Sequence, residues 1–186
     1  MAATFTIFGF AGSLRIGSFN KSILRAALEL VPPGVEIEIF DLEGIPPFNQ
    51  DLDQRAPEKV TEFKTKIRAA DVLLIATPEY NYSIPGVLKN AIDWGSRPSG
   101  DNSFEDKPLA IMGASRGMLG TARAQYHLRQ SCVFLNMHPL NRPEVMVPFA
   151  HEKIDKDGRL IDQKSRELIR QLLENLVGWT KRLKKG

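Results

Sequence analysis

Apolar and polar residues follow two periods along the chain. Short apolar runs predict five strands, at residues 4–8, 35–40, 72–76, 108–112 and 144–147. Apolar residues at every third or fourth position predict the intervening helices, at residues 21–28, 58–69, 87–94, 120–135 and 165–183. The run Val72–Ala76 is continuously apolar, as expected of a central strand that is buried on both faces. Residues 35–40 alternate apolar and polar side chains, which predicts a strand with one wetter face near a sheet edge.

The alternation of strands and helices predicts the fold class. Helices that follow strands one by one cover both faces of a parallel sheet, because the crossovers are right-handed. The expected architecture is an α/β three-layer sandwich with a five-stranded parallel sheet. A chain of 186 residues can bury one substantial core, and no linker or repeat divides it. Residues 1–186 are therefore predicted to form a single domain.

Composition and charge narrow the class of partner. The chain has 42% hydrophobic and 25% charged residues, as a globular protein does, and a formal net charge of +3. Much of that excess lies in a basic tail, Lys181, Arg182, Lys184 and Lys185, so we expect no nucleic-acid partner. No apolar run reaches membrane-spanning length, and no basic and apolar leader follows Met1. These features predict no membrane partner and a cytoplasmic location.

The cysteine and histidine content limits the chemistry. Cys132 stands alone, which excludes a disulfide framework and a cysteine-rich metal site, and its apolar neighbours in a predicted helix indicate a buried structural thiol. His127 in a predicted helix, and His138 and His151 in predicted loops, lack metal-ligand spacing, so we expect surface or interface roles for them. No Gly-x-Ser-x-Gly elbow is present. An enzyme without metal or nucleophile depends on a bound cofactor for its reaction.

The stretch Gly9–Asn20, between the first predicted strand and helix, has the composition of a phosphate site. Its glycines let backbone amides face a ligand, and the helix start adds free N–H groups and a partial positive charge. Ser13, Ser18 and Arg15 add hydroxyls and a planar guanidinium that suit phosphate. An ordinary turn capped by Ser18 or Asn20 would explain only one of these side chains. The Walker and dinucleotide glycine spacings are absent, so a single phosphate and the flavodoxin-like version of the doubly wound fold are predicted.

Two further loops leave predicted strand ends, where open parallel sheets bind ligands. Prolines stiffen the loop around Tyr80 and Tyr82, whose rings can bracket a planar heterocycle while Asn81 and backbone amides bond its edge. A simpler interpretation is that the two tyrosines only cover the end of the sheet. Residues 113–117 can present the hydroxyl of Ser115 and close backbone amides to the other edge of the same ring.

Two motifs carry a family resemblance. Residues 12–20 read G-S-L-R-x-G-S-F-N, and residues 77–94 read T-P-E-Y-N-Y-S-x-P-G-x-L-K-N-A-I-D-W. Together they closely resemble the NAD(P)H-dependent FMN reductase family. Residues 124–130, A-Q-Y-H-L-R-Q, look like its bacterial chromate/quinone reductase branch. The resemblance spans nearly the whole chain.

The resemblance implies non-covalently bound FMN and no catalytic side chain. It places Ser13, Arg15, Ser18 and Asn20 at the FMN phosphate, Pro78, Glu79, Tyr80 and Asn81 along the isoalloxazine, Ser115 nearby, and Leu14 and Phe19 also at the cofactor. The implied reaction passes a hydride from NADH or NADPH to flavin N5 and then electrons to a small acceptor such as a quinone. Azo compounds, metal oxyanions such as chromate, and free flavin stay open as acceptors.

The resemblance also implies assembly, since family members are typically homodimers or homotetramers. Val87–Trp94 and Arg123–Arg129 are the interface candidates. Arg116 and Met118 depart from the glycine-rich third loop of the family, and they could narrow the acceptor pocket or favour a nucleotide phosphate. Two alternatives remain: a flavodoxin-type electron carrier, which the basic net charge disfavours, and a flavin-binding regulatory protein.

Overall fold

The computed structural model of the chain describes residues 5–184. Residues 1–4 and 185–186, and with them the predicted strand residue Thr4 and Lys185 of the basic tail, lie outside the described residues. The elements in chain order are β1 Phe5–Ala11, α1 Phe19–Leu30, β2 Val35–Phe40, η1 Gln50–Arg55, α2 Glu58–Ala69, β3 Val72–Ala76, α3 Gly86–Gly95, β4 Pro108–Ala114, α4 Ala122–Phe134, β5 His138–Pro139, β6 Val145–Val147, α5 Ala150–Lys153 and α6 Gln163–Leu183.

The strands form one parallel sheet in the order β2-β1-β3-β4-β5, with β6 also paired to β4. This is the strand order of the flavodoxin-like fold, so the predicted fold class is confirmed. The edge beyond β4 differs from prediction, because two short strands share it. His138–Pro139 pairs with the start of β4, and Val145–Val147 pairs with its end. A two-residue strand that contains proline has no alternating pattern from which it could be predicted.

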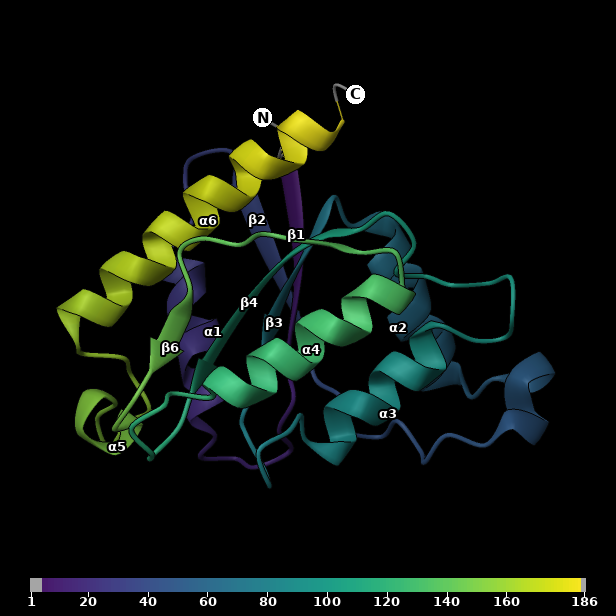
Figure 1. The fold of residues 1–186 in the computed structure, drawn as a ribbon, viewed down its shortest axis with the longest axis horizontal. Coiled ribbons are helices and arrows are strands. Elements are labelled where there is room, and N and C mark those ends of the chain that lie inside the picture. The colour runs from purple at the N-terminus through teal and green to yellow at the C-terminus, as the bar shows by residue number, and fades with distance from the viewer. Residues whose placement is uncertain (1–4, 185–186) are drawn as a thin grey trace.

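The sheet separates two cores. Figure 1 shows α1 and α6 on one side of the sheet and α2, α3 and α4 on the other. Neighbouring strand residues point to opposite sides, as a pleated strand requires. Ile7 and Leu74 belong to the core under α1 and α6, while Phe8 and Ile75 belong to the core under the other three helices. The prediction of a three-layer sandwich is therefore confirmed.

Two strands run further than predicted because glycines inside them allow close packing. The first strand was expected to end at Phe8, but it continues to Ala11 and pairs with β3 there. A Cβ on Gly9 would lie 3.1 Å from the side chain of Leu24, so this glycine lets α1 approach the sheet. A Cβ on Gly113 would lie 1.8 Å from Thr121 Oγ1, so only glycine fits in the extended β4 at this point. The ligand-facing loops therefore begin later than predicted.

The helices follow the predicted positions, with ends that differ by a few residues. The second predicted helix matches α2, and the edge strand predicted at 35–40 matches β2. Across residues 5–184, no helix combines the length and the apolar character that a membrane crossing needs. At the lower edge of Figure 1, the loops after β1, β3 and β4 lie together at the carboxyl ends of their strands.

Candidate active site

The three loops after β1, β3 and β4 enclose a cavity of about 190 Å³, here called the site cavity. Its lining consists of Ser13, Arg15, Ser18, Phe19, Asn20, Pro78, Glu79, Tyr80, Ala114, Ser115 and Arg116. Nine of the eleven residues predicted from the sequence are among them. The other two, Leu14 and Asn81, have exposed side chains and do not line the cavity. Residues from two elements, α1 and β4, and from three loops thus converge on one place.

The first loop, residues 12–18, presents unused backbone donors. Within the described part of the chain, the N–H groups of residues 16–20 have no hydrogen-bond acceptor. Ser18 is the N-cap of α1, and its Oγ accepts a hydrogen bond from Lys21 N at 3.3 Å. Arg15 is exposed and its guanidinium has no partner among the described residues. Free amides, a helix N-terminus and an unpaired guanidinium together form an anion cradle.

The side chain of Asn20, expected to bind phosphate, is hydrogen-bonded to the protein backbone. Its side chain is buried, and it bonds both backbone groups of Ala114 at the end of β4. Asn20 Nδ2 donates to Ala114 O at 2.9 Å, and Ala114 N donates to Asn20 Oδ1 at 3.0 Å. This pair of bonds, here called the Asn20 clamp, ties the start of α1 to the third loop. The residue lines the site cavity, but its amide is committed mainly to the backbone.

The second loop, residues 77–85, turns sharply beside the site cavity. Tyr80 N donates to Ser83 O at 3.1 Å, and Ser83 N donates to Tyr80 O at 2.9 Å. Between them, Asn81 (φ 51°) and Tyr82 (φ 64°) both have left-handed backbones, which is costly for tyrosine. The two rings separate: Tyr80 lines the cavity, whereas the guanidinium carbon of Arg123 lies 3.7 Å from the centre of the Tyr82 ring. Tyr82 therefore packs on α4 and does not bracket the cavity as predicted.

The third loop, residues 115–121, carries the large side chains of Arg116 and Met118, of which one lines the site cavity. Ser115 Oγ donates to Gly117 O at 3.2 Å, and its backbone is held by Val147 O. Arg116 lines the cavity, with its guanidinium carbon 5.9 Å from the centre of the Phe19 ring. Met118 is exposed and is not part of the lining, so of these two side chains only Arg116 faces the site cavity.

The electrostatics of the cavity favour an anion. Arg15 and Arg116 carry positive charge at its rim, and the only acid in its lining is Glu79. The Glu79 carboxylate faces away into α4, where it accepts hydrogen bonds from the N–H groups of Arg123 (3.0 Å) and Ala124 (3.2 Å). This contact joins residues 44 positions apart, so no local pattern in the sequence predicts it.

The remaining titratable residues lie elsewhere. Burial raises the pKa of Cys132 to about 11, and this thiol is not in the cavity lining, so a structural role is appropriate. His127 Nδ1 lies 3.0 Å from Ser83 Oγ. His138 belongs to β5 and His151 to α5, and not to loops as predicted. Among residues 5–184, no group of three or more His, Cys, Asp or Glu is placed to hold a metal ion.

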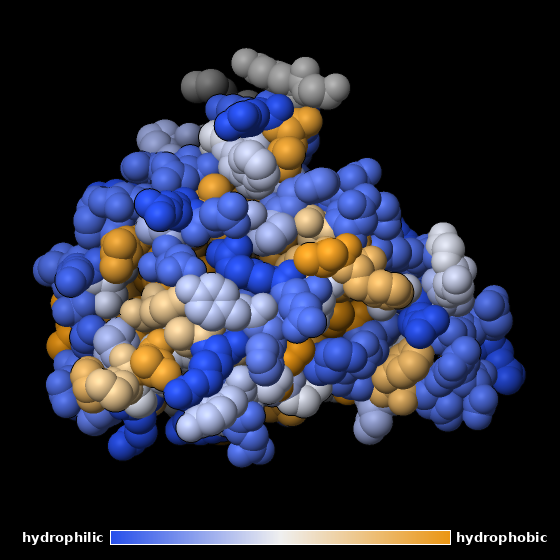
Figure 2. Space-filling model, in the orientation of Figure 1, coloured by the Kyte–Doolittle hydropathy of each residue, from blue (hydrophilic) through white to orange (hydrophobic). Residues whose placement is uncertain are grey.

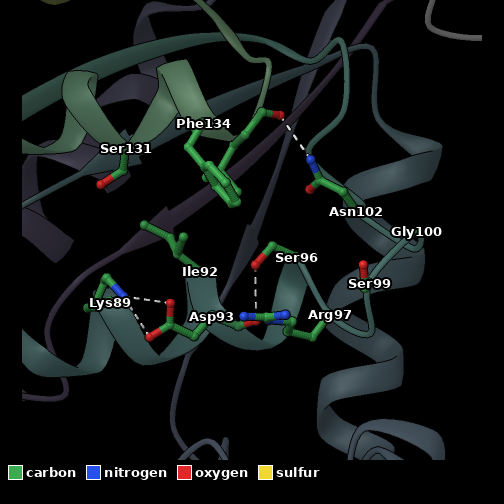
Figure 3. A pocket seen from close by; sticks show the side chains of 11 residues that line it. Lys89, Ile92, Asp93, Ser96, Arg97, Ser99, Gly100, Asn102, Ser131 and Phe134 are labelled. Carbon is green, nitrogen blue, oxygen red and sulfur yellow. Dashed lines mark hydrogen bonds and ion pairs between the residues drawn. The ribbon is translucent and has the colours of Figure 1, made fainter. Parts of the chain in front are cut away.

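A second cavity, the helix groove, lies between α3 and α4 and measures about 390 Å³. Figure 3 shows Phe134 of α4 pointing toward Ile92 and Ser96, beside the Lys89–Asp93 ion pair at 2.6 Å. None of the eleven predicted cofactor residues lines this groove. The helix groove is larger than the site cavity, but its lining has no row of unbonded backbone N–H groups like that of residues 16–20.

Fold and site together define a class. The strand order is flavodoxin-like, and in such sheets ligands bind beyond the carboxyl ends of the strands where the strand order reverses. The site cavity lies there, and its five unused amides fit a phosphate group. The protein is thus of the flavodoxin-like class, with a cavity at the carboxyl ends of its strands whose free amides suit a phosphate group.

Comparison with known proteins names the family. The model of the family described as NADPH-dependent FMN reductase matches residues 5–152. The NAD(P)H-dependent FMN reductase PA1204 of Pseudomonas aeruginosa is 55% identical over 185 residues, which cover 99% of this chain and 100% of that protein. A 2-hydroxy-1,4-benzoquinone reductase of a Burkholderia species is 42% identical over 170 residues, covering 91% of this chain and 93% of that one. The structure of FerB, a flavoenzyme NAD(P)H:(acceptor) oxidoreductase from Paracoccus denitrificans, superposes with a TM-score of 0.87 at 34% identity, covering 96% and 98% of the two chains.

The chain belongs to the NADPH-dependent FMN reductase family. The family membership confirms the resemblance inferred from the two motifs, and with it an enzyme that uses FMN and NAD(P)H. It also favours the reductase over the electron carrier and the regulatory protein, which were the alternatives.

Proposed function

We propose that the protein is an NAD(P)H-dependent quinone reductase whose FMN is bound, without a covalent link, in the site cavity. When bound, FMN supplies the hydride and electron transfer between nicotinamide and acceptor, so no side chain needs to act as a nucleophile. The observation that carries this proposal is the row of unused N–H groups at residues 16–20 at the mouth of a cavity lined by nine predicted residues.

Each part of the cavity has a distinct task in this proposal. The amides of residues 16–20, the hydroxyls of Ser13 and Ser18 and the Arg15 guanidinium bind the FMN phosphate. Asn20 holds the first and third loops together through its clamp. Further along the cavity, Pro78, the backbone of Glu79, Tyr80 and Ser115 line the isoalloxazine, and Phe19 lies at the phosphate end.

Quinones are the acceptor class we propose, because several relatives carry quinone reductase names. Arg116 lines the cavity without a charged partner among the described residues, and it is therefore positioned to attract a further negative group, either on the acceptor or on the nicotinamide nucleotide. Chromate, azo compounds and free flavin are competing acceptors. The enzyme is expected to work in the cytoplasm, where NAD(P)H is supplied, as a single domain.

The test is a visible spectrum of the purified protein before and after anaerobic addition of NADH or NADPH. Flavin bands that bleach, followed by reoxidation with a benzoquinone, would support the proposal, and the relative bleaching rates would give the nucleotide preference. Flavin bands that persist with both nucleotides would leave an electron carrier. Reoxidation by chromate or an azo dye, but not by quinones, would reassign the acceptor. A protein that neither contains nor binds FMN would overturn the site.

We also propose that two copies associate through the face formed by α3 and α4. The α4 residues Val133 (82% exposed) and Phe134 (89% exposed) lie at the helix groove or beside it. Figure 2 shows apolar side chains over this C-terminal part of α4. The patch lies one to two turns beyond Arg123–Arg129, the segment expected from the resemblance, and it borders α3, the other expected segment.

Sedimentation velocity of the wild type and of Phe134→Glu tests this assembly. The wild type is expected to sediment as a dimer or tetramer and Phe134→Glu as a smaller species. Ile161→Glu, which places the same charge at another exposed apolar position, is the matched control and should leave the assembly intact. Equal sedimentation of the wild type and Phe134→Glu would remove this face from the interface.

A further inference from the structure

The carboxylate of Glu79 is satisfied by the protein itself. Glu79 lines the site cavity between Pro78 and Tyr80, but its carboxylate bonds α4 and its side chain is only 13% exposed. Oε2 accepts hydrogen bonds from Arg123 N at 3.0 Å and Ala124 N at 3.2 Å, and Oε1 lies 3.4 Å from Arg123 Nη1. Its acceptor capacity is therefore largely used by one helix terminus.

Helix α4 needs this partner because it has no cap of its own. The N-cap residue Thr121 has a left-handed backbone (φ 74°) and makes no side-chain cap hydrogen bond. Its hydroxyl instead accepts from Gln125 Nε2 at 3.1 Å. Ala122 N is satisfied by Leu119 O. Without Glu79, the N–H groups of Arg123 and Ala124 would lose their acceptor in a half-buried position.

Two other contacts join the second loop to the same helix. The Arg123 guanidinium covers the ring of Tyr82 at 3.7 Å, and Ser83 Oγ lies 3.0 Å from His127 Nδ1. Arg123 and His127 are one turn apart on α4, so the helix contacts the loop along one face. The left-handed residues at the tip of the loop need such support, because an isolated chain rarely adopts that conformation. The backbone that lines the site cavity is thus placed by α4.

We propose that Glu79 is a positioning residue: its carboxylate anchors the second loop to the N-terminus of α4 and thereby sets the affinity for FMN, without touching the cofactor. The inference rests on the proposed FMN site. It also accounts for an acid in a site built for an anionic ligand, since the helix N-terminus and Arg123 offset the negative charge.

The experiment measures the Kd of FMN by fluorescence titration of the flavin-free protein, alongside its thermal melting temperature, for four proteins. Glu79→Ala removes the anchor and is expected to raise the Kd about tenfold or more. Glu79→Gln keeps an oxygen that can accept the helix N–H bonds and should stay within about threefold of the wild type. Asp162→Ala is the matched control: Asp162 caps α6 in the same way, accepting from Ser165 N at 2.9 Å, and it is not part of the cavity lining. It should lower the melting temperature as Glu79→Ala does and leave the Kd unchanged.

The outcomes separate positioning from simple capping. A Kd for Glu79→Ala within twofold of the wild type, with a lowered melting temperature, would make Glu79 only a helix cap and overturn the inference. Equal loss of affinity in Glu79→Gln and Glu79→Ala would overturn it too, because the charge itself would then act on the ligand. If Glu79→Ala does not fold, Glu79→Asp decides, because the shorter side chain keeps the charge but withdraws the carboxylate from the two N–H groups of α4. A raised Kd supports the anchor and an unchanged one refutes it. Failure of the wild type to bind FMN would instead refute the proposed function.

Discussion

The Asn20 clamp offers the sharpest test of how the site is held together. Asn20→Ala removes both hydrogen bonds to Ala114 at a position that is 2% exposed. The Ala114 N–H and C=O would then be buried without partners, at about 1–3 kcal/mol each. The expected loss is about 2–6 kcal/mol, a large part of the stability of a domain of this size. The melting temperature should fall on the order of 10 °C.

Asn90→Ala is the matched control, because Asn90 makes the same kind of clamp elsewhere. Asn90 Oδ1 accepts from Phe48 N at 2.7 Å, and its Nδ2 donates to Pro46 O at 2.9 Å, in a half-buried position on α3. Its loss should cost less stability, about 1–2 kcal/mol, and leave FMN affinity unchanged. Asn20→Ala should weaken FMN binding as well, because it releases the third loop from the first.

Urea denaturation followed by circular dichroism gives the free energies of unfolding, and flavin fluorescence gives the Kd. Equal stability of Asn20→Ala and the wild type would refute the clamp as a source of stability. A stability loss without any change in FMN affinity would show that the two loops keep their positions independently of it.

Three further predictions follow from single residues. Arg15→Ala should raise the Kd of FMN about 10- to 100-fold, as expected for a charge-assisted bond to phosphate, and leave the melting temperature of the flavin-free protein unchanged; unchanged FMN affinity would count against the phosphate assignment. Cys132, buried and with a pKa of about 11, should resist thiol reagents at pH 8 in the folded protein and react fully in denaturant; fast labelling of the folded protein would contradict its burial. The hydrogen bond from the Ser165 hydroxyl lowers the pKa of Asp162, so its stabilisation is complete above the unfolded carboxyl pKa near 4 and is lost as the pH falls through the lower folded value. Urea titrations from pH 7 to pH 2 should show a shallower acid loss in Asp162→Asn, and parallel curves would contradict the linkage.

The sequence allowed the sheet, most helices and the location of the site to be predicted, because these depend on local patterns. The continuous run Val72–Ala76 and the alternating run Val35–Phe40 match strands residue for residue. The first loop could be recognised because its glycines, hydroxyls and arginine are neighbours in the chain.

Contacts between distant residues had no such signature. Asn20 bonds Ala114, 94 positions away, and Glu79 bonds Arg123, 44 positions away. The composition of the loops indicated that Asn20 and Glu79 belong to the site, but it could not identify their hydrogen-bond partners. Gly9 and Gly113 were interpreted as turn residues, whereas they occupy strands where neighbouring side chains leave no room for a Cβ. Close packing between elements decides such positions, and a single sequence does not display it.

The two edges of the sheet are poor templates for a further strand. β2 carries Glu36 and Glu38 on its wetter face, and Glu38 pairs with Lys66 of the neighbouring α2. The opposite edge is broken into strands of two and three residues, one of which contains proline. Neither edge offers a long, uncharged row of backbone groups to which a foreign strand could add. The protein is thereby guarded against open-ended, fibre-like growth of its sheet.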